Sequence, residues 1–226
     1  MMKNNQRIVL INLPRICLAL FVVLQIISMA TYSGGTLFDP ASPGYSFSRN
    51  FLSDLGRCQS WSLENNFIAC QLFNMSILIA GGIFTVFYTC VHIIFVLYKY
   101  YRIALLGSLF GVLGSLSLAV VGLTPADLYP QLHDFSAKWL FRSFFIASIC
   151  YSLVIFKTSI FKNKYATGYI VFAISILVYI LISELGPNPF ESDFALTVQV
   201  ISQKMILIIL FASVYLQTKG LEKISL

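Results

Sequence analysis

The stretch RIALLGSLFGVLGSLSLAVVGL, residues 102–123, carries no charge after its first residue and no proline. A bilayer core is about 30 Å thick and is crossed by a helix of about 20 apolar residues, so this stretch predicts a membrane-spanning helix. Its glycines and serines recur at four-residue spacing, and such small residues let helix backbones approach closely in lipid. We therefore expect this helix to be the most enclosed of its bundle.

Five further apolar stretches of comparable length predict a single all-α membrane domain of six spanning helices over residues 1–226. Hydrophobic residues make up 58% of the chain and charged residues 11%, which excludes a soluble protein. The spans also use most of the chain and leave no room for a separate soluble domain. The expected spans are residues 8–31, 67–98, 102–123, 137–156, 166–185 and 194–216.

The gaps between these spans alternate in charge. Basic residues mark both ends of the chain and the second and fourth gaps, and short loops rich in Lys and Arg stay in the cytoplasm. Eight of the nine acidic residues lie in or beside the other gaps, which we expect to face outward. This predicts a multi-pass protein of a plasma or bacterial inner membrane with both termini cytoplasmic. The net charge of +6 then comes largely from basic residues at cytoplasmic helix ends, which set the orientation and meet anionic headgroups. No nucleic acid partner is expected.

The first span leaves one alternative open. Residues 16–27, followed by Ser28-Met29-Ala30, also have the form of a secretory signal peptide with a small-residue cleavage site. The whole apolar stretch is long enough to span the membrane, so we expect a retained helix. Cleavage would leave the later topology unchanged.

The first outer loop, residues 32–66, contains the segment SFSRNFLSDLG, residues 46–56. Phe47, Phe51, Leu52 and Leu55 recur at helical spacing, which predicts a short amphipathic helix lying at the membrane interface.

Of the five cysteines, only Cys58 and Cys70 can reach the oxidising outer side, where a disulfide can form. Cys70 is already expected inside the second span, which argues against the bridge. The pairing therefore stays open.

Charged side chains inside the spans gather toward the outer side. Arg142 lies in the fourth span, Lys204 in the sixth, and Glu184 at the outer end of the fifth. A charge in hydrocarbon costs at least about 2.5–3.5 kcal/mol, so both cations should face the bundle interior and pair with carboxylates. The acids at suitable depth are Glu184, Asp127 and Asp54. These groups can be structural pairs, or they can form a polar cavity that binds a ligand or performs chemistry.

The residues best suited to chemistry are also expected on the outer side. Asp127 could orient His133 as a general base, Asp54 could assist in acid–base work, and Ser53 is the candidate nucleophile. Clusters of Asp and His can also hold a catalytic metal, but no zinc-ligand spacing is present, so no metal site is predicted and the cofactor is unknown. We expect this group to lie together, with the segment around Asp54 docked over the mouth of the bundle.

These segments also carry a resemblance. Residues 50–56, Asn-Phe-Leu-Ser-Asp-Leu-Gly, resemble the Ser-Asp-Leu-Gly signature of the domain-of-unknown-function 998 family, and Pro125-Ala-Asp127 with His133 is similar to the motif after its third helix. The family is similar in layout to the Frag1/DRAM/Sfk1 group of six-helix membrane proteins. That similarity implies six helices and a lipid-related function, with no defined reaction. Its last helix often carries Glu-Arg where this chain has Gln203-Lys204, which puts a site on that helix in doubt. The resemblance carries over to Asn50, Ser53, Asp54, Asp127 and His133.

The leading expectation is a protein that handles a membrane lipid or small amphiphile at the outer boundary, as a hydrolase or transferase. Asn50, Arg142, Glu184 and Lys204 would then bind the substrate, with a cation on an anionic headgroup. The alternative is a non-enzymatic transporter, scramblase or assembly protein in which the same charges are structural pairs. Broken half-length helices, common in transporters, are not evident in the sequence.

The charge pattern makes a direct prediction of topology. A cysteine introduced at Asn163 should be protected from an impermeant thiol reagent in intact cells, whereas one introduced at Gln131 should react. Labelling is compared with the chain carrying only its native cysteines. The opposite pattern would overturn the expected orientation.

Overall fold

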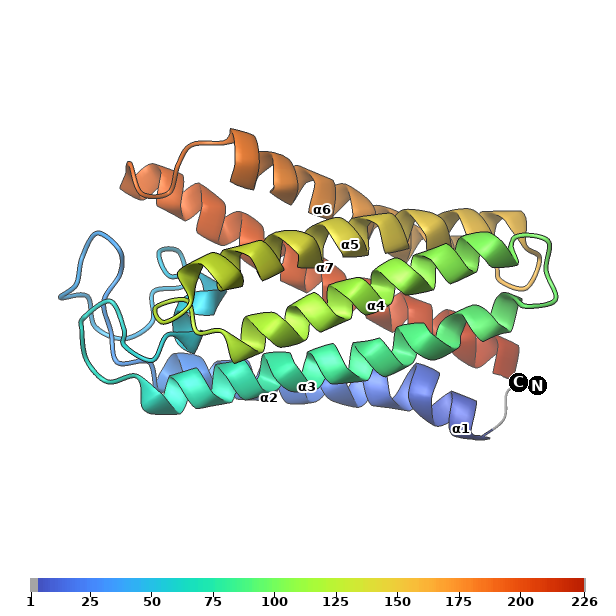
Figure 1. Cartoon of the computed structure of the whole chain (residues 1–226), viewed down its shortest axis with the longest axis horizontal. Coiled ribbons are helices and arrows are strands. Elements are labelled where there is room, and N and C mark those ends of the chain that lie inside the picture. Colours follow the sequence, from blue (N-terminus) through green and yellow to red (C-terminus); the bar gives the residue numbers. More distant parts are fainter. Residues whose placement is uncertain (1–3, 226) are drawn as a thin grey trace.

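The computed structural model describes residues 4–225, in which long helices run side by side and no strand occurs (Figure 1). The beginning of the first helix and the end of the last lie at the same end of the bundle. The expected all-α fold is confirmed. The elements are α1 (Asn4–Arg7), η1 (Ile8–Asn12), α2 (Leu13–Ala30), η2 (Leu52–Gly56), α3 (Phe67–Val91), η3 (His92–Phe95), α4 (Tyr101–Leu123), α5 (Pro130–Lys157), η4 (Asn163–Tyr165), α6 (Ala166–Leu185) and α7 (Asp193–Ser225).

Six helical stretches within residues 4–225 are long and apolar enough to cross a membrane, in agreement with the sequence. The fourth and the sixth exceed the expected spans the most. The fourth begins at Pro130 rather than near residue 137, because proline suits the first turn of a helix and an ion pair between Asp134 and Lys138 at 2.6 Å supports the next turn. The sixth continues well past residue 216 to Ser225.

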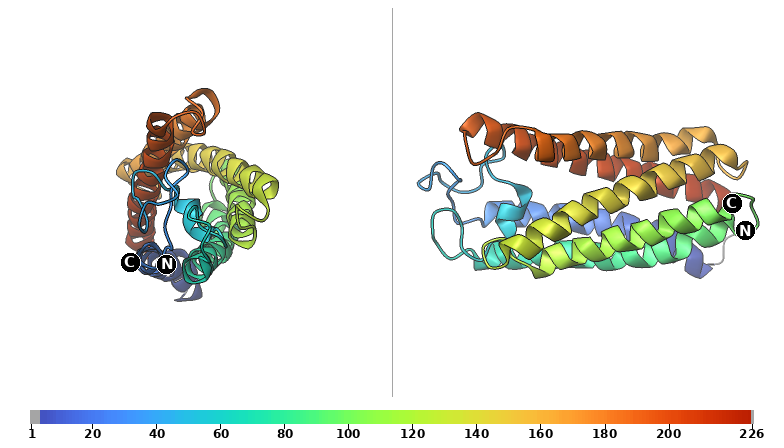
Figure 2. Two further views of the ribbon diagram at one scale, coloured as in Figure 1. Left: turned by 90° about the vertical axis from the view of Figure 1, so that its left-hand side faces the viewer. Right: turned by 45° about the horizontal axis from the view of Figure 1, so that its top comes forward.

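The six long helices form a ring in the order of the sequence, from α2 round to α7 (Figure 2). Each helix packs extensively on the next, and the ring closes where α7 meets α2, which is the least extensive of the neighbouring contacts. The first outer loop enters this ring from one end. This arrangement allows all six helices to face a common interior.

The small residues of α4 pack as expected against both neighbouring helices. A Cβ atom added at Gly111 would collide with the Tyr88 ring of α3, and one added at Gly107 would lie 2.9 Å from Cβ of Cys150 on α5. Nevertheless, the expectation that α4 is the most enclosed span is wrong, because half of the most apolar window of α5 is buried, against 39% for α4. The opposite face of α4 is a leucine stripe that stays exposed. Its members are Leu106, Leu109, Leu113 and Leu116.

Replacing Gly111 with Leu should lower the thermal stability of the protein in detergent. The new side chain must displace Tyr88, and overpacking of this kind typically costs about 1–3 kcal/mol of the free energy of unfolding. Gly82→Leu is the matched control, since Gly82 is exposed and has no neighbouring atom within 4 Å of an added Cβ. Equal melting temperatures for the two variants would contradict this account of the packing.

Candidate functional site

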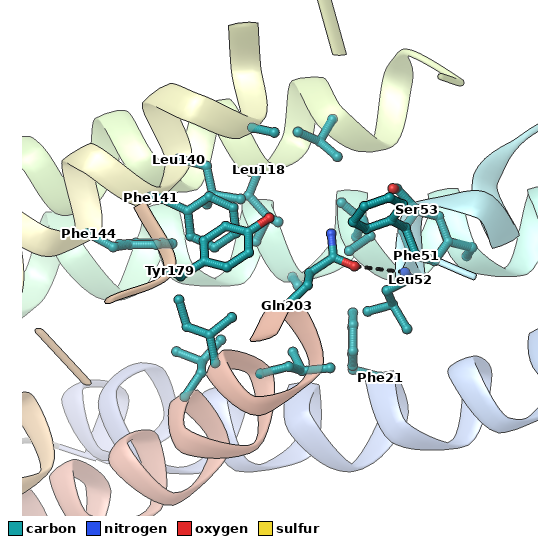
Figure 3. A pocket seen from close by; sticks show the side chains of 18 of the residues that line it. Phe21, Phe51, Leu52, Ser53, Leu118, Leu140, Phe141, Phe144, Tyr179 and Gln203 are labelled. Carbon is teal, nitrogen blue, oxygen red and sulfur yellow. Dashed lines mark hydrogen bonds between the residues drawn. The ribbon is translucent and has the colours of Figure 1, made fainter. Parts of the chain in front are cut away.

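A cavity of about 340 Å³ lies inside the ring of helices. Side chains from α2, α3, α4, α5, α6 and α7 form its walls, and residues of η2 close it at one end (Figure 3). The volume falls within the range of about 300–1,000 Å³ that is usual for pockets binding small molecules. The cavity is therefore the principal candidate for a binding site.

The walls change from polar to apolar along the bundle axis. On α5, His133 and Asp134 border the cavity at the start of the helix, whereas Phe144 borders it about three turns further on. On α7, Gln203 comes before the apolar Leu210 in the same way. The opposite end thus offers only apolar surface, and the polar side chains gather near η2. They are Ser53, His133, Asp134, Tyr179, Gln199 and Gln203.

The cap of the cavity is η2, and its shape is set by short polar side chains. The Asp54 carboxylate accepts a hydrogen bond from the Phe51 backbone N–H at 2.8 Å, which caps the first turn. The Asn50 side chain accepts from the Ser46 N–H at 2.9 Å and donates to the Gly35 carbonyl at 3.0 Å. These local bonds compete with a regular helix. The expected short helix of the first outer loop is therefore present only as the 3-10 helix Leu52–Gly56.

This segment does not lie flat at the membrane interface as expected. Leu52 and Leu55 are buried, with Leu55 fully inaccessible, whereas Phe47 remains exposed. The segment enters the mouth of the ring and packs on α3 and α7. Docking over the bundle mouth was predicted and is confirmed.

Two neighbouring residues of α7 hold the cap from below. The Gln203 side-chain oxygen accepts a hydrogen bond from the Leu52 N–H at 2.8 Å (Figure 3). The ammonium of Lys204, which is buried, donates to the backbone carbonyl of Asn50 at 2.6 Å. The same ammonium lies 5.4 Å from the centre of the Tyr45 ring and 4.9 Å from that of Phe47, within the range of cation–π attraction.

The expectation that Lys204 pairs with a carboxylate is thus corrected. Its direct partners are a carbonyl oxygen and two aromatic faces, which together replace the water that the ammonium has lost. The Asp54 carboxylate is bonded to the same residue, because the Asn50 side-chain amide donates to it at 3.3 Å. Burial raises the pKa of the Asp54 carboxyl, while its hydrogen bonds from Asn50 and Phe51 and the charge of Arg57 act in the opposite direction.

Asp127 and His133 have separate partners. The two Asp127 oxygens accept the backbone N–H groups of Cys58 at 3.0 Å and Gln59 at 2.9 Å, so this carboxylate clamps the first outer loop to the loop before α5. The His133 Nδ1 atom lies 2.7 Å from the Thr124 carbonyl oxygen. The expected orientation of His133 by Asp127 is therefore corrected, and a backbone carbonyl takes that role.

Two of the four predicted catalytic residues, Ser53 and His133, border the cavity, whereas Asp54 and Asp127 do not. Because the Thr124 carbonyl can only accept, Nδ1 of His133 carries the hydrogen. In the neutral ring, Nε2 then keeps its lone pair. Among residues 4–225, no group of three or more His, Cys, Asp and Glu side chains is arranged to hold a metal ion.

The predicted substrate-binding residues do not border the cavity. Arg142 forms an ion pair with Glu184, which joins α5 to the end of α6 and was one of the expected pairings. Asn50 and Lys204 hold the cap. Sequence reasoning did not assign Gln203 or Tyr179 to the site, although the four-residue spacing of Gln199 and Gln203 places two amides on one face of α7.

Replacing Lys204 with Met should loosen the cap. The Asn50 carbonyl would lose its charged donor and keep only the Tyr45 hydroxyl at 3.2 Å, and a hydrogen bond to a charged group typically contributes about 1.5–3 kcal/mol. We expect a lower melting temperature together with faster hydrogen exchange over residues 46–56. Lys138→Met removes an exposed lysine from the same side of the bundle and should leave both measurements almost unchanged. Slow exchange of the cap in the Lys204 variant would contradict the role assigned to this ammonium.

The chain was compared with known proteins. No curated protein and no solved structure matches it. The family model described as "Protein of unknown function (DUF998)" matches residues 26–213, which covers the second to fifth spans completely, most of the sixth, the cap and most of the residues that line the cavity. The chain therefore belongs to the DUF998 family of polytopic membrane proteins.

Proposed function

We propose that the protein binds a single-chain amphiphile, such as a fatty acid or lysolipid, with its tail in the cavity and its polar end beneath η2. The observation that carries this proposal is the polarity of the cavity along its axis. Amide, hydroxyl and imidazole groups lie near the cap, and only apolar side chains follow below them. A molecule with one polar end and one apolar chain matches this order of surfaces.

The size of the cavity favours an apolar tail as its occupant. Cavities lined by apolar side chains are not filled by water, which needs two to four polar partners. In protein cores, unfilled volume costs about 24 cal/mol per Å³. Filling a cavity of about 340 Å³ with apolar atoms would therefore contribute several kcal/mol to the free energy of binding. A hydrocarbon chain supplies these contacts, and the surrounding bilayer is a ready source of such molecules.

The polar end of the ligand would meet groups whose hydrogen-bonding capacity is only partly used. Gln203 uses its oxygen to hold Leu52, and its amide N–H₂ interacts with the Tyr179 hydroxyl, which leaves one amide hydrogen for a carbonyl or phosphate oxygen. Nε2 of His133 can accept a hydrogen bond from a hydroxyl. A neutral or mildly anionic headgroup fits this set better than a cationic one, because the buried Lys204 lies directly behind the cap.

Hydrolysis or group transfer is the second candidate, and one observation favours it. Ser53 and His133 border the same cavity, and the Thr124 carbonyl leaves the basic nitrogen of His133 unprotonated in the neutral ring. A serine activated by histidine could attack an ester at the polar end of the ligand. Release of fatty acid from a lysophospholipid that Ser53→Ala abolishes, with binding intact, would favour catalysis over binding alone.

Binding can be tested with a fatty acid that carries a photoreactive diazirine in its chain. With the protein in a lipid nanodisc, labelling should be saturable and should map to the cavity walls on α5 and α7. Ala137→Phe fills part of the cavity and should reduce labelling several-fold. The control Ala19→Phe adds the same ring to an exposed position of α2 and should have no effect. Non-saturable labelling confined to exposed helix faces, unchanged by Ala137→Phe, would overturn the proposal.

A further inference from the structure

Two thiols approach each other at the edge of the cap. The Sγ atoms of Cys58 and Cys70 are 3.2 Å apart, and both residues are thiols in the structure. Cys58 lies just beyond η2, separated from it by Arg57, and is half-buried, whereas Cys70 lies in the first turn of α3 and is buried. Two sulfur atoms at this separation need only a small rotation of their side chains to reach the bond length of a disulfide.

The backbone around the two cysteines, rather than the sulfur contact, holds them in place. The Cys58 carbonyl accepts a hydrogen bond from the Asn66 N–H at 3.0 Å, and its own N–H is clamped by Asp127. Beside it, the Gly56 carbonyl accepts from the Asn74 amide at 3.1 Å. Because the approach is set by these independent contacts, the thiols stay adjacent without a covalent bond.

We propose that Cys58 and Cys70 form a disulfide that fixes the C-terminal end of the cap to α3. The bond would close the loop of residues 58–70 and restrict the unfolded chain, as disulfides generally do. It would also prevent Gly56 and the following residues from moving away from α3, which closes this edge of the cavity. The proposal does not depend on what the cavity binds. It does require that this loop faces an oxidising compartment, as the charge pattern predicts.

The reaction is an exchange with the disulfide of a thiol oxidase. Cys58, the more exposed of the two, attacks one sulfur of the oxidant as a thiolate, forming a mixed disulfide and releasing one thiolate of the oxidant. Cys70 then loses its proton and attacks Sγ of Cys58, which releases the second thiolate. Two electrons and two protons leave the protein in all, and the oxidant ends as a dithiol. The Asn74 amide donates to Cys70 Sγ at 3.3 Å and so holds this sulfur beside Cys58.

The test counts free thiols in the whole chain. Protein in isolated membranes is denatured in detergent with N-ethylmaleimide, and its intact mass is measured before and after reduction. The chain has five cysteines, so the bridge predicts three adducts before reduction and five afterwards. In Cys58→Ser the number should be four under both conditions. Cys90→Ser, a change remote from the pair, should retain the difference of two.

Peptide mapping and thermal stability complete the test. A cross-linked peptide joining residues 58 and 70 supports the proposal, and a reductant should lower the melting temperature of the unaltered protein but not of Cys58→Ser. Five adducts before reduction would overturn the proposal, as would a cross-link between any other pair. The orientation of the loop is tested separately by labelling at Gln131, so a failure of topology and a failure of the disulfide are distinguishable.

Discussion

The arrangement of the half of the bundle that contains η2 depends on one buried ammonium. Lys204 lies on a helix that crosses the membrane, where an unpartnered charge is unfavourable by several kcal/mol. Within residues 4–225, no side chain of another long helix forms a hydrogen bond or ion pair with this ammonium, whose acceptor is the Asn50 carbonyl. The first outer loop supplies the missing acceptors through the Asn50 carbonyl and the rings of Tyr45 and Phe47. The loop therefore has to descend into the ring, and it closes the cavity as a consequence.

When the loop enters the ring, its own backbone N–H and C=O groups also lose their hydrogen bonds to water, which is unfavourable unless they find other partners. The chain meets this requirement with short polar side chains that bond to nearby backbone groups. Asp54 caps η2, the Asn66 amide donates to the Leu55 and Arg57 carbonyls, and Gln203 on α7 accepts from Leu52. These buried backbone groups thus form hydrogen bonds within the protein, as buried polar groups generally do. The signature residues of this segment thus have a structural explanation that is independent of any chemistry.

The sequence was sufficient to predict the six helices, because length and apolar composition in a membrane protein leave few alternatives. It also identified the segments that meet at the mouth, since Lys204 is charged within an apolar span and Asp54 and Asp127 are acids of the outer loops at a suitable depth. The partners of these groups could not be predicted. Asp54 and Asp127 bond to backbone N–H groups, and Lys204 bonds to a backbone carbonyl. Because almost every residue has these backbone groups, the residue types in the sequence do not indicate which residue is the partner. The cavity was equally hidden, because phenylalanine and leucine that line a cavity look the same in sequence as those that fill a core.

Through hydrogen bonds at both of its ends, η2 connects α7 to α3. Its first residue, Leu52, is bonded to Gln203 of α7 and the preceding Asn50 to Lys204, and its last residue, Gly56, is bonded to Asn74 of α3. Only its middle, around Ser53, is presented to the cavity without a hydrogen bond among the described residues. A ligand beneath η2 would therefore meet a fixed surface, and the cap could not open without breaking buried hydrogen bonds at one end. Lateral entry between helices avoids that cost, and the α7–α2 junction, where the ring is least tightly packed, is the side on which it requires the least disruption.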